Sequence, residues 1–275
     1  MKTLKTFMRL WLLLCFMVVV SCDHWCSHPH ACRIAKVNWE GKWHQAYYSP
    51  SGRLVKLEAT GSKILFYYDG ADKLTKAEIY TTDPVPKYTY EYIQGPYGIV
   101  KSTITESGGF VRTLDFHYAS PSRVDYFVDS EFGGAPGDPA TFVITKQLHY
   151  SGGNITVVDG TVSGNLFTVY SGLKYDKKDN PFLHLAAAVG NPAFFPACNL
   201  VSYPVVDYDI SILSIFSQHN PKKAGYDVDD GAVIQDQEFQ YVYNADAVSS
   251  IHWIDTYGNK DYAFEYNCSF GSDED

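Results

Sequence analysis

Short aromatic-rich segments that end in Gly, Pro, Asn or Asp recur along this chain. Residues 87–92 read Lys-Tyr-Thr-Tyr-Glu-Tyr, and residues 237–243 read Gln-Glu-Phe-Gln-Tyr-Val-Tyr. In both segments alternate positions differ in polarity, which is typical of a β-strand with one packed face and one solvated face. Aromatic residues make up 16% of the sequence, and Tyr and Phe favour pleated, half-buried surfaces. The sequence therefore predicts an all-β protein.

Several of these segments continue into a common turn pattern. A Tyr is followed by a few turn residues, an optional Gly, and then Leu, Ile or Val; the pattern starts at Tyr48, Tyr68, Tyr118, Tyr150 and Tyr243. Each unit is typical of a β-hairpin, which is marginally stable alone and must join its neighbours in a larger sheet. The predicted fold is an antiparallel meander of hairpins that forms a large curled sheet or a partly open barrel. We expect one β domain over residues 45–270, followed by an acidic tail over 271–275.

Residues 181–217 break this rhythm. Asn180 suits the N-cap of a helix, Pro181 fits the first helical position, and Gly190 is a typical stop. A second apolar stretch, 209–217, follows the same pattern, but its β-branched residues leave a strand open. The sequence predicts one or two short helices in this region.

The first residues carry an export signal. Lys2, Lys5 and Arg9 precede an unbroken apolar run over residues 10–20. Such a run is shorter than the roughly 20 residues of a membrane-spanning helix and is typical of a signal peptide. It ends in Val-Val-Ser before Cys22, which resembles the bacterial lipobox, where the Cys accepts lipid and becomes the new N-terminus.

We therefore predict a lipoprotein signal peptide over residues 1–21, a lipidated Cys22 and a tether over 22–44. The alternative is an ordinary secretory signal, with Cys22 kept for a disulfide. The expected location is the bacterial cell envelope, with the outer membrane or the cell surface favoured over the inner membrane. Asp23, directly after the anchor, does not decide between these membranes.

Four further cysteines remain after the signal: Cys26, Cys32, Cys198 and Cys268. An even number in an oxidising compartment predicts disulfides, and Cys26–Cys32 with Cys198–Cys268 is the favoured pairing. Residues 24–32 also contain His side chains beside two of these thiols, a set suited to zinc or copper. Their spacing matches no familiar zinc finger, so the disulfide interpretation is favoured.

The formal net charge is −9, from 22 basic and 31 acidic residues. An acidic chain with scattered basic residues is a poor ligand for a phosphate backbone, so we expect no nucleic-acid partner. An acidic surface rich in aromatic residues suits neutral glycans better than polyanions. Trp39, Trp43 and Trp253 are candidate ligand-stacking residues, since aromatic faces pack on the apolar face of a sugar ring. The alternative places them in the core of the sheet.

The sequence predicts no cofactor, and calcium at residues 227–238 is the alternative kept open. Asp227, Asp229 and Asp230 lie close together, and Glu238 follows eleven residues after Asp227. Clustered oxygen ligands on a turn suit Ca²⁺. However, Ala232 stands where a helix-loop-helix calcium motif has Gly, and an Asp-Gly hairpin turn explains the segment as well.

Two stretches resemble a known family. Residues 175–182 read Tyr-Asp-Lys-Lys-Asp-Asn-Pro-Phe, and residues 217–221 read Ser-Gln-His-Asn-Pro. This pair is similar to motifs of a bacterial lipoprotein family of unknown function with a porin-like β fold. The hairpin units also resemble the Tyr-Asp repeats of RHS-type proteins, and residues 68–70 (Tyr-Asp-Gly) are the nearest copy. The resemblance implies a β architecture and brings no catalytic residues.

We do not expect the barrel to span a membrane, because spanning strands need about 9–11 residues with an uncharged lipid-facing row. No catalytic motif stands out, so a non-enzymatic role is favoured while catalysis stays open. The favoured function is an envelope-anchored β scaffold that binds a glycan, peptide or protein partner. The alternatives are a polysaccharide-active hydrolase with unidentified paired carboxylates, and a carrier of an apolar ligand in a barrel cavity.

Overall fold

The structure is a computed structural model of the whole chain, and it describes residues 33–39, 41–121, 123–132, 139–190, 217–227, 234–245, 247–255 and 258–267. The chain divides into two compact units: Ile34–Tyr266, which is a β-barrel, and Met1–Arg33 with Asn267–Asp275. The signal peptide and five of the singled-out cysteines lie outside the described residues, so the expectations for them stay predictions: Cys22, Cys26, Cys32, Cys198 and Cys268.

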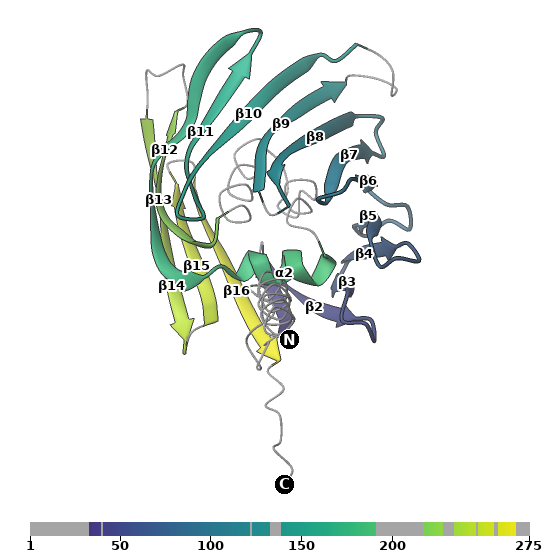
Figure 1. Cartoon of the computed structure of the whole chain (residues 1–275). Coiled ribbons are helices and arrows are strands. Elements are labelled where there is room, and N and C mark those ends of the chain that lie inside the picture. The colour runs from purple at the N-terminus through teal and green to yellow at the C-terminus, as the bar shows by residue number, and fades with distance from the viewer. Residues whose placement is uncertain are drawn as a thin grey trace, which may run out of the picture. The chain divides into compact units, whose positions relative to one another are not determined.

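In the described residues, sixteen antiparallel strands pair in chain order, and the last returns to the first to close the barrel (Figure 1). The strands are β1 (Arg33–Trp39), β2 (Lys42–Tyr48), β3 (Leu54–Ala59), β4 (Ser62–Tyr68), β5 (Leu74–Tyr80), β6 (Tyr88–Gln94), β7 (Ile99–Glu106), β8 (Val111–Ser120), β9 (Arg123–Phe132), β10 (Phe142–Ser151), β11 (Asn154–Val162), β12 (Asn165–Asp179), β13 (His219–Asp227), β14 (Ile234–Asn244), β15 (Ala247–Asp255) and β16 (Gly258–Asn267). The predicted all-β meander is confirmed, and its sheet is a closed barrel.

The barrel starts earlier in the chain than expected. β1 pairs with β2, with Lys36 opposite Gln45 and Trp39 opposite Lys42. Residues 34–44 therefore belong to the barrel, and the predicted tether over 22–44 is too long at its C-terminal end. The sequence signal is weak here because Arg33–Trp39 contains no tyrosine.

The predicted hairpin turns are found. At each of them the starting tyrosine pairs with the first apolar residue of the return strand, next to a register shift: Tyr48 with Leu54, Tyr68 with Leu74, Tyr118 with Val124, Tyr150 with Ile155, and Tyr243 with Val248. Such a shift is a β-bulge, which bends the strand and increases its twist. The recurring sequence pattern therefore encodes a recurring bend, as a curled sheet requires.

Tyrosine hydroxyls on six strands donate to a backbone carbonyl of the strand before. On β4, Tyr68 donates to the carbonyl oxygen of Leu54 at the start of β3, at 2.6 Å. Equivalent bonds of 2.6–2.9 Å join Tyr48 to Ile34, Tyr118 to Ile99, Tyr150 to Val124, Tyr241 to Pro221, and Tyr266 to Val248. Tyrosine suits this position because its ring packs on the core while its hydroxyl satisfies a carbonyl. We refer to these bonds as the tyrosine ladder.

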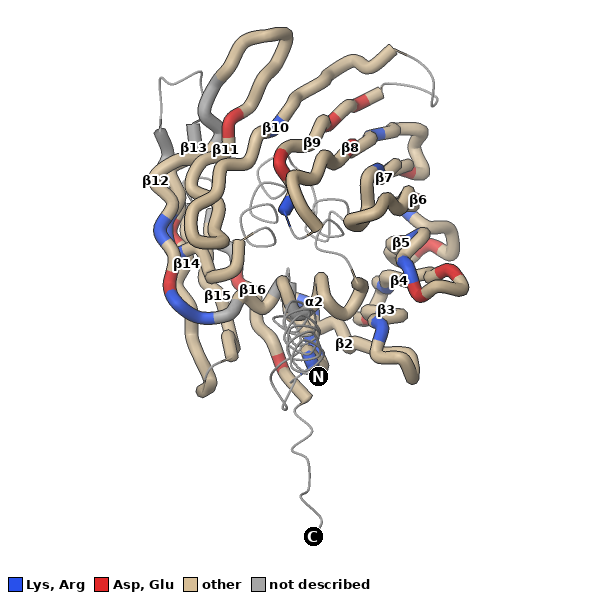
Figure 2. Tube along the Cα trace, in the orientation of Figure 1, with Lys and Arg blue, Asp and Glu red and all other residues tan. Residues whose placement is uncertain are grey.

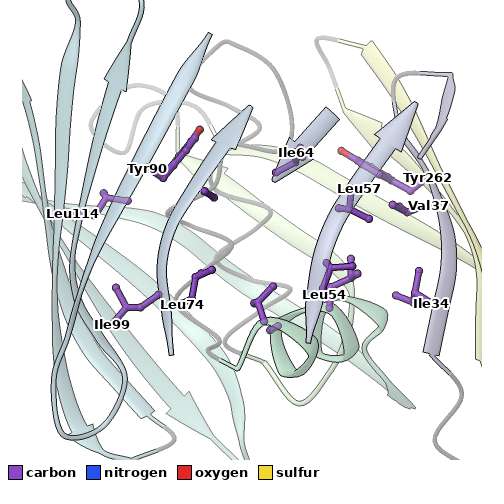
Figure 3. Close-up of a cluster of buried hydrophobic side chains, with 14 of the residues drawn as sticks. Ile34, Val37, Leu54, Leu57, Ile64, Leu74, Tyr90, Ile99, Leu114 and Tyr262 are labelled. Carbon is purple, nitrogen blue, oxygen red and sulfur yellow. The ribbon is translucent and has the colours of Figure 1, made fainter. Parts of the chain in front are cut away.

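Apolar side chains form one continuous core. Leu54, Leu74 and Leu114 are each at most 1% exposed, and Figure 3 shows them with side chains from neighbouring strands. Helix α2 (Pro181–Val189) joins this cluster through Leu185, Ala186 and Val189. The first predicted helix is therefore confirmed, and the second stretch, 209–217, lies outside the described residues except for Ser217.

Helix α2 ends as the sequence predicts. Gly190 adopts a left-handed φ of 81°, and its N–H donates to the carbonyl of Ala187 at 3.0 Å. The guanidinium of Arg53, from the turn between β2 and β3, also donates to Ala187, at 3.5 Å. A cation at this end of the helix is favourable, because the last carbonyls carry partial negative charge.

The outer face of the barrel carries charged pairs on many strands. Lys36 of β1 lies 2.6 Å from Glu265 of β16, and Lys101 of β7 lies 3.2 Å from Asp115 of β8. Further pairs are Lys56–Glu58, Lys76–Glu78, His149–Asp159 and His252–Asp261. Figure 2 shows charged residues along strands in different parts of the barrel. Within the described part of the chain, no helix is both long and apolar enough to cross a membrane.

Candidate functional site

A pocket of about 580 Å³ lies where the barrel wall opens between β13 and β14. The registered pairs between these strands run from Asp227–Ile234 to Lys223–Glu238 and end there, although both strands continue. The lining residues come from β12, β13 and β14: Asp176, Lys177, Lys178, Lys222, Glu238, Phe239, Gln240, Tyr241 and Tyr243. We call this feature the wall pocket.

The tyrosine ladder changes at the wall pocket. Tyr243 pairs with Val248 as the other hairpin tyrosines pair with their partners, but its hydroxyl donates to the carboxylate of Asp176. Tyr241 lies two residues earlier on the same strand. Its hydroxyl makes the tyrosine-ladder bond instead, and donates to the carbonyl of Pro221 at 2.6 Å. The two rings stack at a centroid distance of 6.2 Å with 27° between their planes. The local repeat thus uses two tyrosines where the other hairpins use one.

Asp176 is the centre of a hydrogen-bond network below these rings. Asn220 of β13 donates to it from its backbone N–H at 3.3 Å and from Nδ2 at 3.3 and 3.4 Å. The Asn220 side chain also donates to the carbonyl of Lys178 at 3.2 Å, and Asn220 is fully buried. This network fixes the carboxylate and, through it, the hydroxyl of Tyr243.

Tyr175, which precedes Asp176 on β12, takes part in a second set of hydrogen bonds. The Ser217 hydroxyl donates to the Tyr175 hydroxyl at 3.0 Å and accepts from the N–H of Ile155 at 3.1 Å. In the register, Tyr175 lies opposite Pro221 and Asp179 opposite His219. The two stretches that carry the family resemblance, 175–182 and 217–221, are therefore brought together by β12 and β13.

Burial controls the protonation of the tyrosines at this site. It raises the pKa of the Tyr175 hydroxyl to about 12. The pKa values of Tyr241 and Tyr243 are also raised, in both chiefly by burial and next by the adjoining Asp176 carboxylate. All three hydroxyls therefore stay protonated at neutral pH, and those of Tyr241 and Tyr243 act as hydrogen-bond donors.

Two cations at the rim have no carboxylate partner. Lys177 and Lys222 are exposed, and neither makes an ion pair or hydrogen bond with another side chain among the described residues. Glu238 is also exposed, and its Oε1 accepts from Gln240 at 3.4 Å. The wall pocket thus offers cationic, amide and carboxylate groups around two stacked aromatic rings.

The structure separates the three tryptophans that the sequence grouped for stacking. Trp43 is 42% exposed on β2, whereas Trp253 is 1% exposed and stacks on Phe239 at a centroid distance of 6.2 Å. Because the Trp253 side chain is buried, the predicted ligand-stacking role for Trp253 is wrong. The side chain of Trp39 lies outside the description, and a stacking role for Trp39 and Trp43 stays a prediction.

The calcium candidates do not converge in the described residues. The register places Glu238 four residue pairs along the strand from Asp227, a distance of about 13 Å at 3.3 Å per residue. Glu238 belongs to the wall pocket instead. Asp229 and Asp230 lie outside the described residues, as does the side chain of Asp227, and the rest of the described chain holds no group of three metal-ligating side chains.

Among the residues that line the wall pocket, only Glu238 was predicted from the sequence as a ligand-binding residue. The signal that points to the site is the second tyrosine in the Tyr-Val-Tyr stretch at 241–243. Each of the other turn patterns begins with a tyrosine whose hydroxyl supplies the ladder bond, so an extra tyrosine on the same face marks a departure from the repeat. The sequence pattern alone does not show which group accepts the hydrogen bond of that extra hydroxyl.

The closed antiparallel barrel is of the porin-like class. A porin-like protein from Bacteroides vulgatus ATCC 8482 is similar with a TM-score of 0.54 and 13% identity, over 86% of this chain and 99% of that one. A porin-like protein from Bacteroides uniformis ATCC 8492 gives a TM-score of 0.47 and 13% identity, over 85% of this chain and 98% of that one. A TcdB2-TccC3-TEV structure gives a TM-score of 0.33 and 11% identity, over 76% of this chain and 11% of that one. No protein-family model and no curated protein matches the sequence. The expected porin-like β fold is confirmed.

Proposed function

We propose that this chain is an envelope lipoprotein, anchored through Cys22, whose barrel stands in water beside the membrane and acts as a non-enzymatic binding scaffold. The observation that carries the proposal is the charged outer wall around a core that is largely apolar and holds a few buried polar groups, among them Asp129 and Lys146. A membrane-spanning barrel has the opposite arrangement, with an apolar band facing lipid and a polar interior.

The distribution of the charged pairs supports this orientation. They occur where β1 meets β16, on β3, on β5 and where β7 meets β8, so they are not confined to one pair of strands. Each lipid-facing Lys or Arg destabilises a spanning barrel by about 2–4 kcal/mol at the bilayer midplane. In water the same pairs keep the wall soluble, and the lipid on Cys22 supplies the membrane attachment.

The wall pocket supports a binding role. Its volume falls within the range of small-molecule sites, and it combines apolar rings with a few polar groups. Two carboxylates line it, as a hydrolase requires, but Asp176 is held by Asn220 and Tyr243 as an acceptor. That arrangement favours a positioning role for Asp176 over acid–base chemistry.

A leader exchange tests the anchor and the barrel separately. The full chain is compared with a version in which residues 1–22 are replaced by an ordinary cleavable secretory leader. We expect the native chain in the membrane fraction after an alkaline wash, with an acylated N-terminal peptide by mass spectrometry. The exchanged version should appear in the soluble fraction. If it stays in the membrane pellet, or if native Cys22 carries no acyl chain, the proposal is wrong.

A further inference from the structure

We propose that the wall pocket binds a sugar that carries a carboxylate, such as a uronic acid within a short glycan. This inference rests on the binding role proposed above and adds the chemical class of the ligand. It is carried by three observations at one place: an opening in the wall, two stacked tyrosines, and two lysines that have no side-chain partner among the described residues.

The opening follows from the way the repeat is broken. At four other turns the tyrosine that begins the turn also bonds to the strand before its own: these are Tyr48, Tyr68, Tyr118 and Tyr150. Here the hydroxyl of Tyr243 reaches past β13 to Asp176 on β12, and the β13–β14 pairs stop at Lys223–Glu238. A local rule that is broken at one place in a repeat is typical of a functional site.

The stacked tyrosines provide a platform of fixed geometry. The Tyr241 hydroxyl is held by the Pro221 carbonyl and the Tyr243 hydroxyl by Asp176, so neither ring must be ordered when a ligand arrives. Preorganised rings lose little side-chain entropy on binding. An aromatic face is the usual partner for the apolar face of a sugar ring, and the nearby Gln240 amide and Glu238 carboxylate suit sugar hydroxyls.

The lysines select an anion. Several lysines elsewhere on the wall are neutralised or covered: Lys36 and Lys101 pair with carboxylates, and Lys63 lies over the Tyr80 ring at 4.5 Å. Lys177 and Lys222 have neither kind of partner within the described chain, yet both line the same pocket. Two ammonium groups at the rim of an aromatic pocket suit a carboxylate, with which they form charge-assisted hydrogen bonds.

The charge of the whole chain limits the size of that anion. The net charge of −9 repels a polyanion such as a nucleic acid at long range. A short glycan with one or a few carboxylates is repelled less and gains the local contacts. A sugar that carries a carboxylate therefore suits both the two stacked tyrosine rings and the net charge of the chain.

Titration calorimetry on the full chain tests the inference. The probes are trigalacturonic acid, the neutral trisaccharide of galactose, and inorganic phosphate. The variant is Lys177→Gln with Lys222→Gln, and the matched control is Lys73→Gln, an exposed lysine in the turn between β4 and β5. Removing one charge-assisted contact should weaken binding by about tenfold, so the double variant should bind the acidic trisaccharide about a hundredfold more weakly.

We expect trigalacturonic acid to bind the native chain and the control within about twofold of each other, and to bind more weakly at high salt because surface charges are screened. The inference is overturned if the neutral trisaccharide binds as tightly, if the double variant binds as the native chain does, or if inorganic phosphate displaces the sugar equally well. It is also overturned if neither trisaccharide binds at millimolar concentration. None of these results affects the leader exchange, which tests the anchored, water-exposed barrel by itself.

Discussion

Tyr243 on β14 donates a hydrogen bond to the carboxylate of Asp176 on β12, although β13 lies between these two strands in the sheet. Asn220, on that middle strand, donates to the same carboxylate. One acceptor therefore fastens three strands at the place where the backbone pairs between β13 and β14 have ended. This side-chain network takes over part of the role that the ladder of backbone hydrogen bonds has elsewhere in the barrel.

Replacing Asp176 should destabilise the barrel more than replacing a surface carboxylate. Asp176→Asn should lower the free energy of unfolding by about 2–3 kcal/mol, because hydrogen bonds to a charged acceptor are worth about 1.5–3 kcal/mol. Tyr243→Phe should lower it by about 1 kcal/mol, and the double variant by less than the sum, since both remove the same bond. Urea unfolding measures all three. Asp261→Asn, at an exposed pair with His252, is the control. Additive effects would show that Asp176 and Tyr243 do not act together.

The tyrosine ladder gives a second prediction. Tyr68→Phe keeps the ring and removes only the bond to the Leu54 carbonyl, so it should lower the free energy of unfolding by about 1–2 kcal/mol. Tyr97→Phe, at a tyrosine that is 49% exposed, should change it by less than about 0.5 kcal/mol. Chemical denaturation compares the two variants. If Tyr68→Phe is no more destabilising than Tyr97→Phe, the ladder bonds do not stabilise the fold.

The strands and turns were predictable because their signals are local. Alternating polarity marks β6 and β14, and the turn pattern that starts at Tyr68 marks a bulge and a reversal within a few residues. The helix over 181–189 was predictable for the same reason, since a cap, a first-turn proline and a terminal glycine lie within one short stretch.

The closure of the barrel and the wall pocket were not predictable in this way. Lys36 meets Glu265 across almost the whole length of the chain, and nothing near either residue in the sequence indicates the other. The pocket likewise depends on where the β13–β14 pairs stop, which is a matter of register. The turn and the hydrophobic pattern set the register of a hairpin. The point at which its pairs stop also depends on the neighbouring strands, so a single sequence gives the hairpins but not the opening between them.

The buried tyrosines predict a loss of stability at high pH. A tyrosine whose pKa is raised in the folded state holds its proton there after the unfolded chain has lost it. Its stabilising contribution is therefore complete below the unfolded pKa of about 10 and is lost as the pH rises from that value toward the folded pKa. For Tyr175 the folded pKa is about 12, and burial raises the pKa of Tyr150 and Tyr266 as well.

The free energy of unfolding should accordingly fall between pH 10 and pH 12, by up to about 1.4 kcal/mol per pH unit for each such tyrosine. Urea unfolding at several pH values, with tyrosinate absorbance as a second readout, measures the slope. Tyr175→Phe should make the fall of the free energy of unfolding with pH less steep, by the contribution of one titrating tyrosine. A stability that does not change over this range would contradict the burial of these hydroxyls.

The contact between Gly190 and Arg53 gives the last prediction. A Cβ at Gly190 would lie 2.6 Å from Nη1 of Arg53, and the φ of 81° is unfavourable for a residue with a side chain. Gly190→Ala should therefore lower the free energy of unfolding by about 1–2 kcal/mol. Gly108→Ala, where an added Cβ would meet nothing within 4 Å, is the matched control and should be nearly neutral.

Adding Arg53→Ala separates the two causes. If the clash with the guanidinium contributes, Gly190→Ala should be less destabilising in the Arg53→Ala background than in the native chain, because the neighbouring group is gone. The part that remains is the backbone strain at the end of α2. If Gly190→Ala is as mild as Gly108→Ala in both backgrounds, then neither the left-handed conformation nor the approach of Arg53 determines how this helix ends.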